Sequence, residues 1–222
     1  DFIEILQACK INDIVPNFST RSTKWLRDNK QREKILECIG RFAFSIQGLS
    51  EAQEIIGFVN YFDIDPRKVS FQIVNQTISK YELKPILNLA SLNNIVVTIL
   101  GFKTSGRGAD FAESWQFKKN PHIWLDAVTE LMDTGINVYF GLDTCIIEEQ
   151  ERSLKELGVP DWMYHKNEGS FSMYIDAVKG MMGPSSFCKP EEMIECKIKN
   201  RDGKIKKAAD LAFEIQEGFK KF

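Results

Sequence analysis

Residues 94–108 read NIVVTILGFKTSGRG, and they carry the clearest indication of fold class in the chain. Its β-branched apolar run at 95–100 predicts a strand buried on both faces, as in parallel sheets. A glycine-rich basic loop follows at once, and α/β proteins place ligand sites in loops at the carboxyl ends of their strands. Lys103 and Arg107 favour an anionic ligand there, unless the loop is only a tight connection with solvated charges. No Gly-Lys-Ser/Thr follows, so the loop is not a Walker phosphate loop.

Strands and helices alternate along the first 160 residues. This spacing predicts parallel strands joined by right-handed crossovers, an α/β fold. A closed barrel needs about eight strands, so five strands predict an open sheet or a partial (β/α) barrel that lacks its first βα units. Pro85 is expected in the first turn of its helix. The predicted strands are 14–20, 41–47, 69–75, 95–100 and 136–143, and the helices between and after them are 31–39, 51–62, 80–91, 121–134 and 148–157.

Periodicity weakens after about Pro160. An alternating stretch at 172–176 predicts an exposed strand that returns at 181–182, and 208–222 predicts a terminal helix. We therefore expect a partial barrel at 1–160 and a small hairpin-and-helix extension at 161–222.

Composition narrows the class of protein. A net charge of −2 over 222 residues argues against general binding to nucleic acid or anionic membranes. No apolar run is long enough to span a bilayer and no signal peptide is present, so a cytoplasmic protein is expected. Five cysteines at irregular spacings fit a reducing compartment better than a disulfide framework. The chain opens inside an amphipathic pattern without an initiator methionine, and we expect that it lacks its natural beginning.

Four segments resemble the middle and end of a radical S-adenosylmethionine (SAM) domain. They are ILQACKINDIVPNFSTRS at 5–22, RFAFSIQG at 41–48, VSFQIVN at 69–75 and VVTILGF at 96–102. The segment at 41–48 is similar to the Val-x-Val-Ser-Ile-Asp-Gly pattern of the family. The segment GSFSMYIDAVKGMMGPSSFC at 169–188 is similar to the hairpin of the auxiliary-cluster extension known as SPASM or twitch.

The resemblance implies a SAM site at the carboxyl ends of the strands. Contacts to the ribose and carboxylate of SAM would come from Ser45, Gln47, Gln72 and Asn75. The adenine would pack against Leu100, Gly101 and Phe102. The alternatives are that the polar residues satisfy loop backbone groups and that 100–102 are core and turn.

The family chemistry is cleavage of SAM to a 5′-deoxyadenosyl radical, with the electron supplied by a [4Fe-4S] cluster. The resemblance implies an electron donor as a partner and, from the extension, a peptide or protein substrate.

The sequence departs from the family at its defining motifs. Neither Cys-x-x-x-Cys-x-x-Cys, which holds the cluster, nor the Gly-Gly-Glu loop after the second family strand is present. Both would lie before Asp1, so either a further segment or a partner chain is expected to cover the open barrel edge. Ser185 stands after Pro184, where the family extension has cysteine.

Three further residues are candidates for chemistry. Asp143 ends a strand and would act as a general base or orient a substrate, or else cap the following helix. Cys145 and Cys188 would be metal ligands, and buried thiols are the alternative.

Two other functions remain open on the sequence. One is a non-catalytic binding module that has lost the iron–sulfur site. The other is an unrelated α/β enzyme that binds a phosphorylated or carboxylated metabolite through Lys103 and Arg107.

Overall fold

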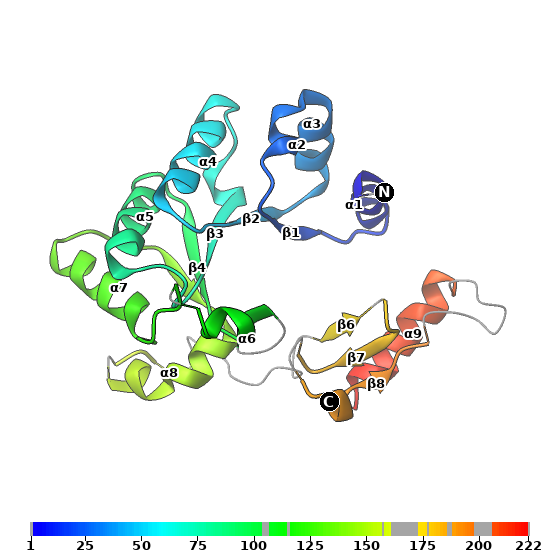
Figure 1. Cartoon of the computed structure of the whole chain (residues 1–222). Helices are drawn as coiled ribbons and strands as arrows, with labels where there is room; N and C mark the ends of the chain where they lie inside the picture. Colours follow the sequence, from blue (N-terminus) through cyan, green and yellow to red (C-terminus); the bar gives the residue numbers. More distant parts are fainter. Residues whose placement is uncertain are drawn as a thin grey trace. The chain divides into compact units, whose positions relative to one another are not determined.

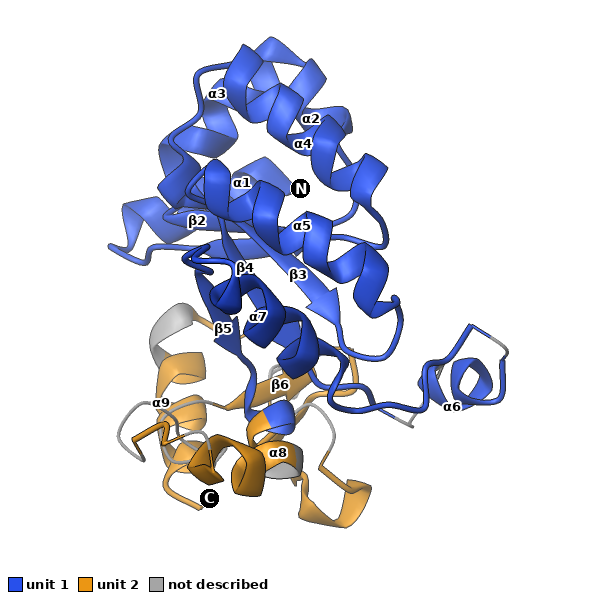
Figure 2. Ribbon diagram, turned by 90° about the vertical axis from the view of Figure 1, so that its left-hand side faces the viewer, with its two compact units in different colours: residues 1–146 blue, residues 147–222 orange. Residues whose placement is uncertain are grey.

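The computed structural model describes residues 2–103, 107–114, 116–156, 158–160, 173–176, 178–185, 188–197 and 206–221. The chain divides into two compact units, Asp1–Ile146 and Ile147–Phe222, which Figure 2 distinguishes by colour. The division into a barrel and an extension at residue 160 stays a prediction.

The first unit contains a five-stranded sheet in which all strands are parallel. The strands lie in chain order: β1 (Asn17–Thr20), β2 (Arg41–Ser45), β3 (Val69–Val74), β4 (Val96–Leu100) and β5 (Phe140–Leu142). Figure 1 labels the first four, and Figure 2 labels β5 beside β4. This confirms the predicted α/β class, and the arrangement matches a partial parallel β/α barrel. Because all five strands run the same way, their carboxyl ends meet at one edge of the sheet.

Helices connect the strands and pack against one another in sequence. Helix α1 contacts α3, α4 contacts α5, and α5 contacts α7. The helices are α1 (Phe2–Ile11), α2 (Lys24–Arg27), α3 (Asn29–Cys38), α4 (Leu49–Tyr61), α5 (Lys80–Leu92), α6 (Arg107–Ala112), α7 (Ile123–Asp133) and α8 (Thr144–Glu156), with a 3-10 turn η1 at Pro66–Lys68. Figure 2 shows α6 standing apart from the helices that pack along the sheet.

The core lies where the central strands meet these helices. Phe42 and Phe44 of β2, Phe71 of β3 and Ile99 of β4 are all buried. Burial of each such side chain stabilises the fold by about 1.5–3 kcal/mol. In β2 three consecutive residues, 42–44, are buried, which is the pattern of a strand covered on both faces.

The start of α5 explains one difference from the sequence prediction. The Glu82 carboxylate accepts hydrogen bonds from the Ser79 backbone N–H (3.2 Å) and from the Ser79 hydroxyl (2.9 Å). This capping interaction sets the first helical residue at Lys80. Pro85 therefore lies inside the helix and not in its first turn, so that expectation was wrong.

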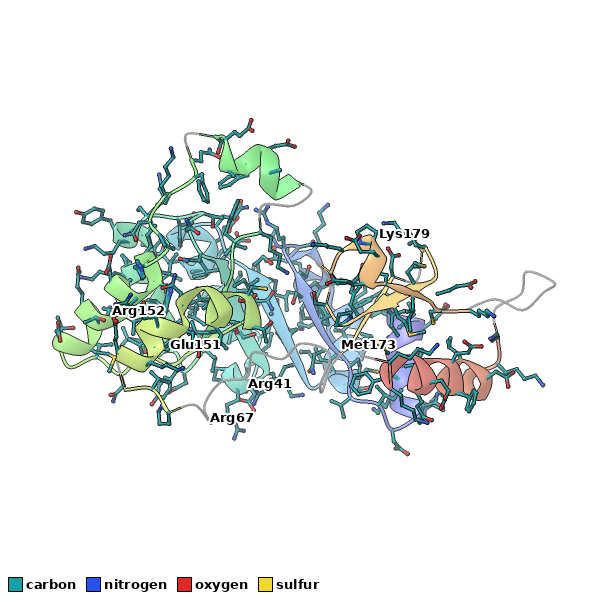
Figure 3. The ribbon with its side chains drawn as sticks, turned by 90° about the horizontal axis from the view of Figure 1, so that it is seen from below. Arg41, Arg67, Glu151, Arg152, Met173 and Lys179 are labelled. Atoms are coloured by element: carbon teal, nitrogen blue, oxygen red, sulfur yellow. The ribbon has the colours of Figure 1, made fainter. Side chains whose placement is uncertain are left out.

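The second unit contains the larger part of α8, from Ile147 on, together with a small antiparallel sheet and a further helix. Its other described elements are β6 (Tyr174–Asp176), β7 (Met181–Gly183), the 3-10 turn η3 (Pro190–Glu192), β8 (Ile194–Glu195) and α9 (Ala208–Phe219). In the turn between β6 and β7, Asp176 Oδ1 accepts from the backbone N–H groups of Val178 (3.0 Å) and Lys179 (2.9 Å), and Figure 3 labels Lys179. The left-handed conformation that closes this turn falls on Gly180 (φ +67°). The predicted beginning of the hairpin, residues 169–172, lies outside the described residues.

None of the described helices combines the length and the apolar character that crossing a bilayer requires.

Candidate functional site

A cavity of about 920 Å³ opens at the carboxyl ends of the parallel strands in the first unit. Segments that follow β2, β3, β4 and β5 all contribute to its wall. The lining residues are Gln47, Val74, Thr77, Ile78, Glu82, Leu100, Gly101, Phe102, Lys103, Gly108, Phe111, Gln116, Lys118 and Asp143. The cavity therefore lies where α/β folds place their ligands.

The β2 end supplies Gln47, which two residues hold. The guanidinium of Arg21 donates to Gln47 Oε1 (2.7 Å), and the backbone N–H of Gln47 donates to Glu51 Oε2 (2.7 Å). Arg21 also forms a salt bridge with Glu51 (3.4 Å). Ser45 pairs with Gln72 across β2 and β3, and among the described residues neither is part of the cavity lining.

The β3 end supplies two residues that anchor a distant segment. Asn75 is buried, and its Nδ2 donates to the carbonyl of Pro121 (2.8 Å). Gln76 Nε2 donates to the Lys118 carbonyl (2.9 Å), and the Lys118 N–H donates to the Gln76 carbonyl (2.9 Å). These bonds hold residues 118–121 beside the cavity. The Asn75 amide nitrogen thus binds a backbone carbonyl, and Asn75 Oδ1 is buried without a hydrogen-bond partner among the described residues.

The β4 end supplies Leu100, Gly101, Phe102 and Lys103, which all line the cavity. Gly101 is closely packed, because a Cβ atom at this position would lie 2.6 Å from the Cβ of Cys145. The Phe102 ring contacts the rings of Phe117 (centroids 4.6 Å apart) and Phe111 (5.9 Å). This aromatic cluster forms an apolar wall beside the glycine.

The β5 end supplies Asp143. Its Oδ1 accepts from the backbone N–H of Gly101 (2.8 Å) and of Ile146 (3.1 Å). The second bond caps the amino end of α8, which is the capping alternative raised by the sequence. Since Asp143 also lines the cavity, a catalytic role stays a prediction.

The basic loop is described only in part. Lys103 lines the cavity, and Arg107 is the first residue of α6, but the structure does not describe the Arg107 side chain. Ser105 and Gly106 lie outside the described residues.

The two cysteines predicted as metal ligands fall in different units. Cys145 lies in the first turn of α8, and Cys188 follows β7, where a Cβ on Gly183 would lie 2.5 Å from its Sγ. The five cysteines form no disulfide. Within the described ranges no group of three or more His, Cys, Asp or Glu side chains is placed to hold a metal ion. Their metal roles stay predictions.

Among the residues of this region that the sequence analysis did not identify are Arg21, Glu82 and Lys118. Glu82 carries a local signal, since Ser-x-x-Glu at 79–82 is the pattern of a capping box. Arg21 and Lys118 carry no local sequence signal, because their hydrogen-bond partners Gln47 and Gln76 lie 26 and 42 residues away in the sequence.

Comparison with known proteins gives a structural likeness. Neither the family models nor the curated protein sequences give a match to this chain. The crystal structure of Streptococcus suis SuiB bound to the precursor peptide SuiA is similar to it, with a TM-score of 0.56 and 16% sequence identity. The match covers 83% of this chain and 45% of the SuiB chain, so the present chain spans less than half the length of that structure. At this identity the likeness concerns the fold alone.

Proposed function

We propose that the first unit binds S-adenosylmethionine in the strand-end cavity and serves as the SAM- and substrate-binding part of a radical SAM enzyme. The observation that carries the proposal is that one cavity is lined by Gln47, Leu100, Gly101 and Phe102. The resemblance to the radical SAM family assigns SAM contacts to these same four positions. The likeness to SuiB supports the same fold.

The chemistry of the lining fits a nucleoside sulfonium amino acid. Ligand pockets for small molecules span about 300–1,000 Å³ and combine an apolar wall with a few polar groups. Phe102 and Leu100 offer apolar surface for an adenine ring, and Gln47 and Lys103 offer hydrogen-bond donors. Bound SAM would supply an electrophilic sulfonium and its 5′-carbon, while the residues of this chain bind and orient it.

The described residues do not fit a [4Fe-4S] cluster. Such a cluster needs cysteine thiolates close together. The sequence has no Cys-x-x-x-Cys-x-x-Cys, and the described residues include no group of three or more ligating side chains. No radical step is therefore assigned to them, and their proposed part is the binding of SAM and substrate.

A peptide or protein is the proposed substrate. SuiB is bound to a precursor peptide in its crystal structure, and the segment at 169–188 resembles an extension found in radical SAM enzymes. Both observations support a peptide.

Calorimetric titration of the 222-residue chain with SAM tests the proposal. We expect saturable binding that Gln47→Ala weakens about fivefold to tenfold, the effect of one net hydrogen bond. Gln53→Ala, which changes an exposed glutamine of α4, is the matched control and should leave the affinity unchanged. Absence of SAM binding by the unaltered chain would overturn the proposal.

An anionic metabolite is the second candidate ligand. The observation that favours it is that Lys103 and Lys118 both line the cavity. A ligand that binds only the native state raises the midpoint of thermal unfolding. Protection by inorganic phosphate, lost in Lys118→Gln, together with no protection by SAM, would favour this candidate.

A further inference from the structure

Arg21, Gln47 and Glu51 form a hydrogen-bonded network at the carboxyl ends of β1 and β2. Arg21 Nη2 lies 2.7 Å from Gln47 Oε1 and 3.4 Å from Glu51 Oε1. Glu51 stands in the first turn of α4, so its carboxylate reaches back to accept from the Gln47 backbone N–H at 2.7 Å. Gln47 is thus held at both its backbone and its side chain.

This network gives the Gln47 amide a defined polarity. A glutamine amide has one acceptor, the oxygen, and one donor group, the NH₂. Arg21 carries only donors and remains charged at all physiological pH values, so it pairs with the oxygen. Among the described residues the Gln47 NH₂ donates to no acceptor, and Gln47 lines the cavity. The group that remains for a ligand is therefore a donor.

Both carboxylates in the described cavity wall accept hydrogen bonds from other groups of the protein. Asp143 Oδ1 accepts from two backbone N–H groups, and Glu82 Oε2 accepts from the backbone and hydroxyl of Ser79. The lysines Lys103 and Lys118 lie in the same wall. Together with the Gln47 NH₂, this favours a ligand group that accepts hydrogen bonds and carries negative charge.

We propose that Arg21 is a positioning residue that holds the Gln47 amide with its NH₂ toward the cavity, so that Gln47 binds the carboxylate of the SAM methionine moiety and not a ribose hydroxyl. The inference rests on the proposed function for the identity of the ligand. A hydroxyl both donates and accepts, and it would bind either end of the amide. A carboxylate only accepts, and it requires the NH₂.

The test compares SAM with decarboxylated SAM, which lacks only the carboxylate, by calorimetric titration of the 222-residue chain. We expect Arg21→Ala to weaken SAM about fivefold, no more than Gln47→Ala does, because Arg21 acts only through the Gln47 hydrogen bond, and to change decarboxylated SAM by less than about twofold. Arg21→Lys, which keeps a donor, should restore most of the affinity for SAM. Equal weakening of both ligands, or of neither, would overturn the assignment.

Arg27→Ala is the matched control. Arg27 donates to Glu54 across α2 and α4 at 2.9 Å, and like Arg21 it is an exposed arginine paired with a glutamate of α4. It is not part of the described cavity lining. We expect this variant to bind both ligands as the unaltered chain does.

A readout without ligand separates this inference from the proposed function. In a ¹⁵N-labelled chain, the side-chain NH₂ signals of Gln47 are identified by their loss in Gln47→Ala. They should shift in Arg21→Ala and stay in place in Arg27→Ala. If the unaltered chain binds neither ligand, the proposed function is wrong, and so is the assignment of Gln47 to the SAM carboxylate. The NH₂ signals would still show whether Arg21 orients the Gln47 amide. Unchanged signals in Arg21→Ala would overturn the positioning role.

Discussion

The carboxylate of Asp143 accepts the backbone N–H of Gly101 at 2.8 Å, and this bond joins the carboxyl ends of β5 and β4. The same oxygen accepts the Ile146 N–H at 3.1 Å and caps α8. One side chain therefore holds two strand ends and a helix start in register at the wall of the cavity.

Replacement of Asp143 separates its structural role from a catalytic one. Asparagine keeps the accepting oxygen and caps helices about as well as aspartate, so Asp143→Asn should change the free energy of unfolding by less than about 0.5 kcal/mol. Asp143→Ala removes the acceptor and should cost about 1–2 kcal/mol. Urea unfolding followed by circular dichroism measures both. A loss in Asp143→Asn as large as that in Asp143→Ala would show that the charge, and not the cap, is what stabilises this corner.

The close packing of Gly101 predicts that it tolerates no side chain. In Gly101→Ala the new Cβ would meet the Cys145 Cβ at 2.6 Å and the Ile146 backbone nitrogen at 3.0 Å. We expect a loss of about 1–3 kcal/mol in the free energy of unfolding from overpacking. Gly141→Ala, on the neighbouring strand β5, is the control, since a Cβ there meets nothing within 4 Å. Similar stability of the two variants would contradict the packing described for β4 and α8.

Replacement of the buried Asn75 amide is expected to lower the free energy of unfolding. Asn75→Asp replaces the NH₂ that donates to the Pro121 carbonyl with a second acceptor, and it does so at a buried position. Loss of a buried hydrogen bond costs about 1–3 kcal/mol, and more when a charge is left there. Asn60→Asp, an exposed asparagine of α4, should cost much less. The comparison requires only thermal or urea unfolding, and equal effects would argue that the Asn75–Pro121 bond contributes nothing.

Glu130 predicts how stability depends on pH. Hydrogen bonds from Lys80 and Lys84, both at 2.6 Å, lower the pKa of the Glu130 carboxyl from 4.5 to about 2. Because the folded-state pKa is lowered, this contribution is fully present above about pH 4.5 and is lost as the pH falls through about 2. Urea unfolding between pH 2 and 7 should show a shallower loss toward low pH in Glu130→Gln than in the unaltered chain.

The control for Glu130 is Glu33→Gln. Glu33 is an exposed glutamate of α3 that forms no ion pair with any described residue. Its replacement should leave the slope of stability against pH unchanged. If both variants flatten the slope equally, the lysines Lys80 and Lys84 do not stabilise the charged form of Glu130.

The strands of the first unit were predictable because the signal for them is local. The apolar run at 95–100 becomes β4 at Val96–Leu100, and the segment at 69–75 becomes β3 at Val69–Val74. Apolar and β-branched residues mark such strands within a few positions. The predicted burial of β4 on both faces was wrong, because Val97 and Ile99 are buried while Val96 is exposed, so only one face of this strand is fully covered. Boundaries were less predictable. The fifth strand was predicted at 136–143 and is only Phe140–Leu142, and α8 begins at Thr144 because Asp143 caps it.

The cavity wall was predictable in part for the same reason. Leu100 ends β4, and Gln47, Gly101, Phe102, Lys103 and Asp143 lie within three residues after a strand, so parallel topology alone brings them to one edge. Asn75 follows a strand as well, yet its amide is turned to the Pro121 carbonyl. No local pattern distinguishes these two outcomes.

The order of the main elements, the parallel sheet and the edge of the sheet at which a ligand site was expected could all be predicted from the sequence, since periodicity and strand direction are properties of short segments. Which side chains at that edge line the cavity and which hold the fold depends on tertiary packing. Arg21 orients Gln47, Gln76 holds Lys118, and Asp143 joins Gly101 to α8. Except for the bond from Ile146 to Asp143, these hydrogen bonds link residues that are 26 to 42 positions apart in the sequence. Hydrogen bonds over such separations form only once packing has brought the partners together.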